Sequence, residues 1–190
     1  PQDNFELRQT WDFTDNLARW DSVWYLDIAE NGYKYEEDQQ LANIVFFPLY
    51  PMLMRFVGMF TLGNYTLAGW IISSVSLLGA LVFLRKLSSE FHQKIDKNFA
   101  TISLLVFPTA IFLNLVYTEA LFLFLSVALV YFYKKENYTW ASIFAILVSF
   151  TRVTGILLAG LLAVEYLFKF KLNFSNLKSK FNALAPIALC

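Results

Sequence analysis

The 190-residue sequence is poor in cysteine, histidine and charge. It holds one Cys and one His, Cys190 and His92, too few for a disulfide framework or a Cys/His metal cluster, which needs about three or four ligands. Charged residues make up 16% of the chain and hydrophobic residues 57%, against roughly 25% and 45–50% in ordinary soluble domains. These values exclude a simple soluble globule. We expect no resident cofactor or metal, and the sequence leaves dependence on an added divalent cation open.

Several motifs that would indicate other functions are also missing. There is no Gly-rich phosphate loop, no GxSxG elbow and no zinc-binding motif, so nothing indicates soluble-nucleotide binding, triad hydrolysis or metalloprotease chemistry. The basic residues come in short clusters rather than in a continuous stripe, and we expect no nucleic-acid partner. The chain begins at Pro1 without a leader and stops within an apolar stretch, so we expect an internal part of a longer protein.

What the sequence does contain is a series of long apolar runs. Because a spanning helix needs roughly 20 apolar residues, these runs predict an all-α integral membrane protein with a polytopic helical bundle. The predicted segments are about 66–84, 98–118, 120–133, 138–151 and 153–168, with the start of another at 183–190. Short helices of this kind persist inside a larger bundle by tilting or by ending in a protein-lined cavity. No repeat or flexible linker divides the chain, so we predict one membrane domain.

The distribution of charge predicts how these segments are oriented. The first 43 residues hold 10 acidic and 3 basic residues. Ten of the 15 basic residues lie in three later loops: Arg85, Lys86, Lys94, Lys97, Lys134, Lys135, Lys169, Lys171, Lys178 and Lys180. Because Lys and Arg concentrate in short cytoplasmic loops, we expect residues 1–65, the 117–119 turn and the 151–155 turn on the extracytoplasmic face. Residues 44–60 would then lie in the interface, with Arg55 snorkelling to headgroups.

One carboxylate lies within an aromatic pattern near the N-terminus. Residues 15–31 predict an amphipathic helix closed by Gly32, and at about 100° per residue Asp21 falls in the middle of its apolar face. The other members of that face are Leu17, Trp20, Trp24, Tyr25 and Ile28. Asp21 has two interpretations. It is either a structural group, which pairs with an Arg or accepts hydrogen bonds from a neighbouring backbone, or a general base that lies beside aromatic rings lining a sugar-binding site. Glu30 lies toward the other side of this helix, where solvated charge is expected.

Two more charged residues stand at the ends of apolar runs. Placing the charge of Arg152 in the hydrocarbon core costs free energy, so we expect this residue at a membrane boundary or a cavity. There it either snorkels to the interface or binds a phosphate through its planar guanidinium. Glu119 follows Thr118 at the start of an apolar run, where a Thr N-cap and a first-turn acid ordinarily stabilise the helix dipole. We favour that interpretation of Glu119 over a role in substrate binding.

Four strings of sequence together resemble one family of membrane enzymes. They are RWDSVWYLDIAENGY at 19–33 with FFPLYP at 46–51, FPTAIFL at 107–113 running on to YTEALF at 117–122, and TRVTG at 151–155. In this order they resemble the PIG-V-like mannosyltransferases, the GPI mannosyltransferase 2 family of the GT-C superfamily. Trp24 stands where eukaryotic members tend to carry His, so the resemblance does not by itself imply a GPI precursor as the acceptor.

The resemblance implies a reaction and roles for the residues above. The enzyme would transfer mannose from a polyprenyl-phosphate carrier to a lipid or glycan acceptor on the extracytoplasmic or lumenal face of the plasma or endoplasmic reticulum membrane, with inversion. Asp21 would be the catalytic base, and Arg152 would stabilise the phosphate. The other candidate substrate-binding residues are Trp20, Trp24, Tyr25, Glu30, Tyr117 and Glu119.

Two other functions are compatible with the sequence. The first is a GT-C transferase of another sugar, because no residue pattern in the sequence indicates which configuration of a sugar hydroxyl would be recognised. The second is a transporter or lipid-binding scaffold in which Asp21 and Arg152 form a structural or ion-pathway pair. Transporters place such charges near the bilayer midplane within inverted repeats, whereas here both are expected at the outer boundary and no repeat is found. The transferase is therefore preferred.

Overall fold

The computed structural model describes residues 17, 18, 20–33, 43–91, 96 and 98–169. All regular structure in this part of the chain is helical, which confirms the predicted all-α class. The α-helices are α1 (Ser22–Asn31), α2 (Leu49–Gly58), α3 (Tyr65–Phe91), α4 (Phe99–Val106), α5 (Glu119–Lys134), α6 (Tyr138–Ser149) and α7 (Val153–Lys169). Two 3-10 helices, η3 (Asn43–Val45) and η4 (Pro108–Asn114), lie between them.

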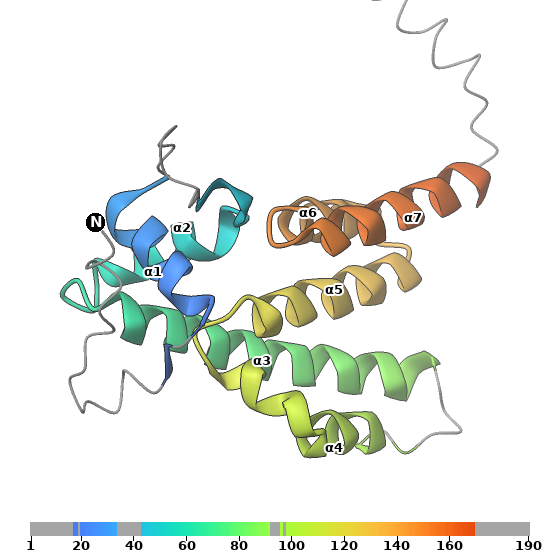
Figure 1. Cartoon of the computed structure of the whole chain (residues 1–190). Coiled ribbons are helices and arrows are strands. Elements are labelled where there is room, and N and C mark those ends of the chain that lie inside the picture. The colour runs from blue at the N-terminus through green and yellow to red at the C-terminus, as the bar shows by residue number, and fades with distance from the viewer. Residues whose placement is uncertain (1–16, 19, 34–42, 92–95, 97, 170–190) are drawn as a thin grey trace, which may run out of the picture.

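The helices stack around α5 (Figure 1). α3 and α5 run side by side in the same direction, α6 and α7 follow on one side of α5, and α4 returns on the other. α1 and α2 pack at the end where α3 begins. The polar contact between Ser73 Oγ and the Tyr117 carbonyl, at 3.2 Å, fixes α3 beside the start of α5.

Small residues allow α3 and α5 to approach closely. The buried face of α3 carries Ala68, Gly69, Ile72, Ser73, Ser76 and Ala80, spaced three or four residues apart as one helix face requires. A Cβ added at Gly79 would lie 2.7 Å from the Phe124 ring. Small residues at such contacts are typical of helices that pack in membranes. Among the described helices, α3 is long and apolar enough to cross a membrane, and η4 with α5 reaches the same criterion if this bent pair counts as one span.

The predicted helix at 98–118 is broken, and that prediction is wrong. α4 ends at Val106, Phe107 is extended with ψ 135°, and Pro108 begins η4. Pro has no backbone N–H and disfavours helical geometry in the residue before it, so the helix cannot continue through this position. η4 then meets α5 at an angle of 94°. The predicted segments 66–84, 120–133, 138–151 and 153–168 overlap α3, α5, α6 and α7, and 183–190 lies outside the described residues.

The amphipathic helix predicted over residues 15–31 is shorter than expected. Asp15, its predicted first residue, lies outside the described residues, and α1 begins at Ser22 with Asp21 at the N-cap. Trp20 has a φ of +52°, which interrupts any helix that would carry the aromatic face back to residue 17. The predicted end is confirmed, because Gly32 closes α1 with φ +84° and donates its N–H to Ile28 O.

Arg55, which was expected to snorkel to headgroups, also makes contacts within the bundle. Its Nε donates to Ala29 O at 2.8 Å and its Nη2 donates to Ile28 O at 3.1 Å. These carbonyls belong to the last turn of α1, where most carbonyls lack an intrahelical partner; Ile28 O also accepts the Gly32 N–H. The guanidinium of α2 therefore caps α1 and fixes the two helices to each other.

The basic segments meet at the end of the bundle opposite α1. Lys135, after α5, pairs with Glu90 of α3, and Lys169 of α7 pairs with Glu136 at 2.5 Å. Lys86 lies 5.4 Å from the centre of the Phe83 ring on the same part of α3. The helices α3, α5 and α7 thus end together, and their first turns lie together at the other end of the bundle.

Candidate active site

Three segments far apart in the sequence meet at the end of the bundle where α5 and α7 begin. The Val116 N–H donates to Leu17 O at 3.0 Å, and Ser22 Oγ donates to Val116 O at 2.8 Å. These bonds hold the start of α1 against the linker that leads into α5. The turn between α6 and α7 joins the same region through Arg152.

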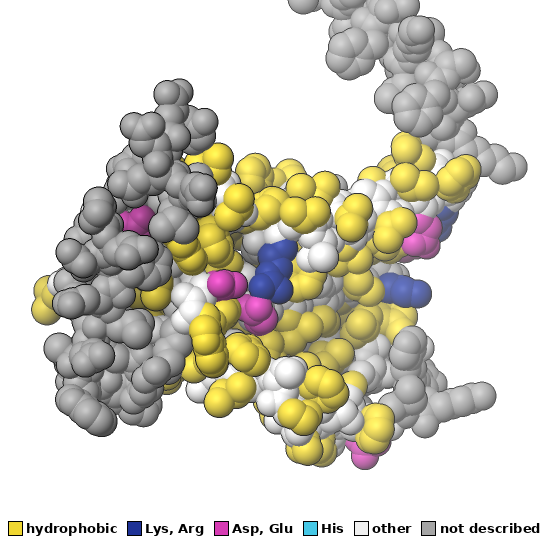
Figure 2. Space-filling model, in the orientation of Figure 1, with side chains coloured by type: hydrophobic (Ala, Val, Ile, Leu, Met, Phe, Trp, Pro, Cys, Tyr) yellow, Lys and Arg dark blue, Asp and Glu magenta, His cyan; other side chains and the backbone are white. Residues whose placement is uncertain are grey.

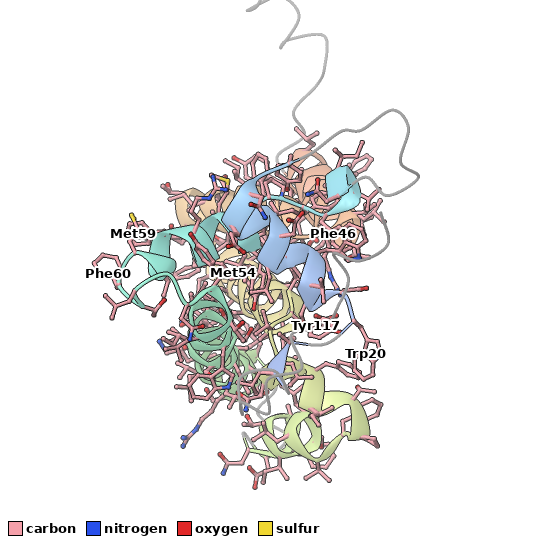
Figure 3. All side chains as sticks on the ribbon, turned by 60° about the vertical axis from the view of Figure 1, so that its left-hand side comes forward. Trp20, Phe46, Met54, Met59, Phe60 and Tyr117 are labelled. Carbon is pink, nitrogen blue, oxygen red and sulfur yellow. The ribbon has the colours of Figure 1, made fainter. Side chains whose placement is uncertain are left out.

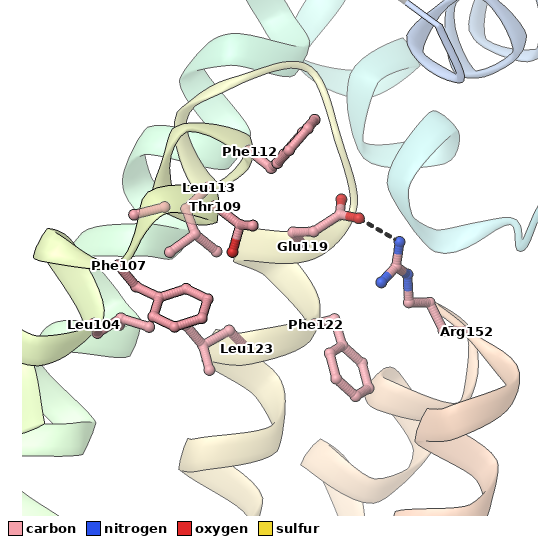
Figure 4. A pocket seen from close by; sticks show the side chains of 10 residues that line it. Leu104, Phe107, Thr109, Phe112, Leu113, Glu119, Phe122, Leu123 and Arg152 are labelled. Atoms are coloured by element: carbon pink, nitrogen blue, oxygen red, sulfur yellow. Dashed lines mark hydrogen bonds and ion pairs between the residues drawn. The ribbon is translucent and has the colours of Figure 1, made fainter.

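Arg152 points inward to the first residues of α5. Its Nε donates to Thr118 Oγ1 at 3.0 Å. Its Nη2 lies 2.5 Å from Glu119 Oε1, as Figure 4 shows. Thr118 is completely buried, and its hydroxyl is also 3.5 Å from the Tyr25 hydroxyl. A continuous polar chain therefore runs from α1 through Thr118 to Arg152 and Glu119.

The structure changes the interpretation of Thr118 and Glu119. Thr118 occupies the N-cap position of α5 but makes no side-chain capping bond, because its hydroxyl faces Arg152 instead. Glu119 uses one carboxylate oxygen for Arg152. Its Oε2 is buried and has no hydrogen-bond partner among the described residues. We expected Thr118 and Glu119 only to stabilise the dipole of the helix that follows them. That interpretation is incomplete, since both residues make long-range contacts.

The turn between α6 and α7 is built to place Arg152. α6 ends at Ser149, Thr151 Oγ1 donates to Val148 O at 2.6 Å, and α7 begins at Val153. A Cβ added at Gly155 would lie 2.1 Å from the Val148 carbonyl oxygen, so only glycine permits this approach of the two helices. Because of this tight turn, Arg152 lies between the end of α6 and the start of α7, and its side chain is directed at α5.

Asp21 lies at the N-cap of α1 with an exposed side chain. It is not buried within an aromatic face, as the helical wheel predicted, because the left-handed φ of Trp20, directly before it, interrupts the helix. It lies near enough to the Tyr117 and Tyr25 hydroxyls to interact with both electrostatically. Trp20, directly before it, holds a left-handed φ that is costly for a bulky residue. Such strained positions cluster at functional sites.

The aromatic residues form two groups beside α1. Trp20 is 69% exposed and lies 6.1 Å from Phe112, which contacts Tyr117 at 5.7 Å between ring centres. Figure 3 shows Trp20 and Tyr117 together near one end of α1. In the second group, Trp24 stacks on Phe46 at 5.8 Å. The aromatic groups thus form two walls rather than the one expected.

Tyr25 connects these walls to the charged residues. Its ring meets Phe46 at 5.1 Å, and its side chain is 6% exposed. Burial raises the pKa of Tyr25; the Thr118 hydrogen bond and the Arg152 charge lower this pKa, whereas Glu119 and Asp21 raise it. Tyr25 is therefore surrounded by the polar groups of all three segments. Glu30, in contrast, is exposed at the far end of α1, about 14 Å from Asp21 along the helix axis, and is not brought into this group.

Two cavities adjoin Arg152. The first, of about 410 Å³, is bounded by Arg152, Glu119 and Thr109 and is otherwise mainly apolar; its large apolar residues are Leu104, Phe107, Phe112, Leu113, Phe122 and Leu123. The second, of about 330 Å³, has Tyr25, Phe46, Thr151 and Thr154 in its wall. Arg152 lines both, whereas Asp21 lines neither. Figure 2 shows charged side chains of both signs side by side in the middle of a largely hydrophobic face.

Reasoning from the sequence missed Ser22, Phe46, Phe112 and the long-range contacts of Thr118. Each of these residues belongs to one of the four strings that carry the family resemblance, and that membership was the available signal. Among the described residues, no group of three or more His, Cys, Asp or Glu side chains is placed to hold a metal ion.

Comparison with known proteins identifies the family of this chain. GPI mannosyltransferase 2 of Yarrowia lipolytica is 31% identical over 130 residues, which are 68% of this chain and 34% of that relative. The chain thus matches about a third of the relative's length. No solved structure matches the chain with significance. The model of the Mannosyltransferase (PIG-V) family matches residues 3–188, and the chain therefore belongs to the PIG-V mannosyltransferase family.

Proposed function

We propose that this chain forms part of a membrane glycosyltransferase that moves mannose from a polyprenyl-phosphate carrier to a glycolipid or glycan acceptor. The observation that carries the proposal is the meeting of three family strings at Arg152, which lies between two cavities. The printed name of the Yarrowia relative, a GPI mannosyltransferase, supports mannose as the sugar and a glycolipid as the acceptor.

The membrane setting of the proposal follows from charge and helix direction. α3, α5 and α7 end together at the basic residues, which the positive-inside rule assigns to the cytoplasm. The Arg152 site, at the opposite end, then faces the lumen or the cell exterior. We propose a polytopic protein of the endoplasmic reticulum or plasma membrane in which α2, about 15 Å long and too short to span, lies in the interface.

The leaving group of the proposed reaction is a phosphate. An acceptor hydroxyl oxygen attacks the anomeric carbon, the bond from that carbon to the phosphate oxygen breaks, and its electron pair stays on the phosphate. Arg152 stabilises the charge that develops there, because its guanidinium presents several donors in one plane. Nε and Nη2 already have partners, whereas Nη1 has no hydrogen bond to another described residue.

Asp21 is the proposed base that takes the proton from the acceptor hydroxyl. Its side chain is exposed, and a base must be accessible to the substrate. A single displacement of this kind inverts the anomeric centre. Trp20 and Tyr117 on one side and Trp24 and Tyr25 on the other are proposed to pack against the sugar and the acceptor. The free oxygen of Glu119 is proposed to accept a hydrogen bond from a sugar hydroxyl.

The test is a transfer assay with full-length protein in detergent, radiolabelled polyprenyl-phosphate-mannose and glycolipid extract. Asp21→Asn should lower the transfer rate about a hundredfold or more, because general-base catalysis contributes roughly 10²–10⁴-fold. Glu30→Gln makes the same carboxyl-to-amide change on the same helix, away from the site, and should retain the wild-type rate. Equal rates for Asp21→Asn and wild type would exclude Asp21 as the base. Faster transfer from the glucose-linked carrier than from the mannose-linked one would identify another sugar.

A further inference from the structure

Thr118 carries a buried hydroxyl that its own helix does not use. The residue stands at the N-cap of α5 and is completely buried, yet its side chain makes no capping hydrogen bond, although a Thr at this position ordinarily accepts from a backbone N–H of the first turn. Buried hydroxyls in folded proteins find a partner, and the partners here are Arg152 Nε at 3.0 Å and the Tyr25 hydroxyl at 3.5 Å. The stability of α5 therefore does not account for this hydroxyl, whose shorter contact is to Arg152.

Arg152 is held at two neighbouring nitrogens of its guanidinium. Nε donates to Thr118 Oγ1, and Nη2 donates to Glu119 Oε1 at 2.5 Å. A guanidinium is planar and carries its five N–H donors in fixed directions. A single hydrogen bond would let the group turn about that contact, whereas two bonds to neighbouring nitrogens fix its plane. The N–H groups of Nη1, which have no hydrogen bond to another described residue, then point in one direction.

Thr118 contacts Arg152 without reaching the space around it. Arg152 lines both cavities, whereas Thr118 lines neither. Figure 4 shows the guanidinium at the edge of the larger cavity, beside Glu119. Because Thr118 is completely buried, a ligand in either cavity would touch the guanidinium and not the Thr118 hydroxyl. Any effect of this hydroxyl on a ligand must therefore pass through Arg152.

The main chain that carries Thr118 is itself fixed from two directions. Ser22 Oγ of α1 donates to Val116 O at 2.8 Å, and Ser73 Oγ of α3 donates to Tyr117 O at 3.2 Å. These two carbonyls directly precede Thr118 in the chain, and both serine side chains are buried. A group that orients another must be held by its own neighbours. The Thr118 hydroxyl meets this condition, because α1 and α3 hold the linker on which it stands.

We propose that Thr118 is a positioning residue, whose hydroxyl holds Nε of Arg152 so that the remaining N–H donors of the guanidinium face an anionic group bound beside it. The inference rests on the proposed function, which gives Arg152 the phosphate of the donor. It adds a role for a residue that touches no substrate. It also predicts that the hydroxyl of Thr118, and not its methyl group, determines the affinity for the donor.

The first measurement is equilibrium binding of radiolabelled polyprenyl-phosphate-mannose to full-length protein in detergent. Thr118→Val keeps the shape of the side chain and removes the hydroxyl, whereas Thr118→Ser keeps the hydroxyl and removes the methyl group. Thr118→Val should weaken binding about tenfold, because the Nε–H of Arg152 loses its acceptor, and Thr118→Ser should retain the wild-type affinity. A residue that only fills space would give the reverse order. That order, or wild-type affinity in Thr118→Val, would overturn the proposal.

The second measurement separates the contact from a general loss of structure. Thr101→Val is the matched control, because Thr101 Oγ1 is also buried but has no hydrogen-bond partner among the described residues, and it should leave donor binding unchanged. In an Arg152→Ala background, Thr118→Val should cause no further loss, because a residue that acts through Arg152 has no effect once that side chain is removed. A further loss as large as in the wild-type background would contradict the positioning role.

The third measurement needs no ligand. Phenylglyoxal modifies a guanidinium faster when its nitrogens are not held in hydrogen bonds, and mass spectrometry gives the rate for the peptide that contains Arg152. Thr118→Val should raise this rate and Thr118→Ser should not. If Thr118→Val does not fold, Thr118→Ala compared with Thr118→Ser makes the same test, since these two side chains differ by the hydroxyl alone. An unchanged rate overturns the positioning role. A raised rate with unchanged donor binding in Arg152→Ala would support the Thr118 contact and overturn the proposed function instead.

Discussion

The two ends of the bundle both carry ion pairs, but the pairs differ in their surroundings. At the basic end, Lys135 with Glu90 and Lys169 with Glu136 are exposed surface pairs, and such pairs contribute little to stability. At the other end, Arg152 also bonds the completely buried Thr118, and Glu119 keeps one buried oxygen unpaired. The ion pairs at the basic end are thus surface contacts, whereas the pair at the other end belongs to a polar cluster that reaches buried groups.

The largest effect is expected from Gly155→Ala, which pushes α7 away from α6 and displaces Arg152. The added Cβ would lie 2.1 Å from a backbone oxygen that cannot move aside. We expect a loss of stability of about 1–3 kcal/mol, as for overpacking, and at least a hundredfold loss of transfer, because misplacement of about 1 Å costs that much. Thermal unfolding and the transfer assay measure the two effects.

Gly160→Ala is the matched control, because nothing lies within 4 Å of a Cβ at Gly160 of the same helix. It should stabilise α7 by up to about 1 kcal/mol through helix propensity and leave transfer intact. If Gly155→Ala behaves like Gly160→Ala, the tight turn does not position Arg152.

A smaller effect is expected when the two ends are compared by removing one cation from each. Arg152→Ala should weaken binding of the polyprenyl-phosphate donor about tenfold or more, since hydrogen bonds to charged groups contribute roughly 1.5–3 kcal/mol. Lys135→Ala should change neither donor binding nor the melting temperature measurably. Equilibrium binding of a radiolabelled donor measures the difference, and unchanged binding in Arg152→Ala would leave Arg152 with a structural role.

The smallest effect is expected from Arg55→Ala, which removes the cap that α2 provides to α1. Two hydrogen bonds to Ile28 O and Ala29 O are lost, each contributing about 0.5–1.5 kcal/mol. We expect a destabilisation of about 1–2 kcal/mol, with donor binding retained because Arg55 is at the opposite end of α1 from Asp21. Met52→Ala, an exposed change on the same helix, is the comparison, and equal melting temperatures for the two variants would contradict the capping role.

The comparison also shows where sequence reasoning succeeded. The apolar runs predicted the helical class, and the four strings predicted the family, because each depends on local residue order. The continuous helix at 98–118 was wrong although Pro108 was visible, since apolar length was given more weight than the helix-breaking geometry of proline. The aromatic face around Asp21 was wrong because it assumed a helical Trp20, and the left-handed φ of Trp20 leaves no signal in composition or periodicity.

The sequence by itself determined that this chain is a helical member of the PIG-V mannosyltransferase family, because hydrophobic runs, proline and short motifs act through local propensity and spacing. Only the tertiary structure decided that Arg152 meets Thr118 and Glu119, more than 30 residues away, and that Arg55 caps α1. The physical reason is that such contacts depend on how helices pack, and packing is fixed by small residues, a broken helix and one tight turn that act together across the chain.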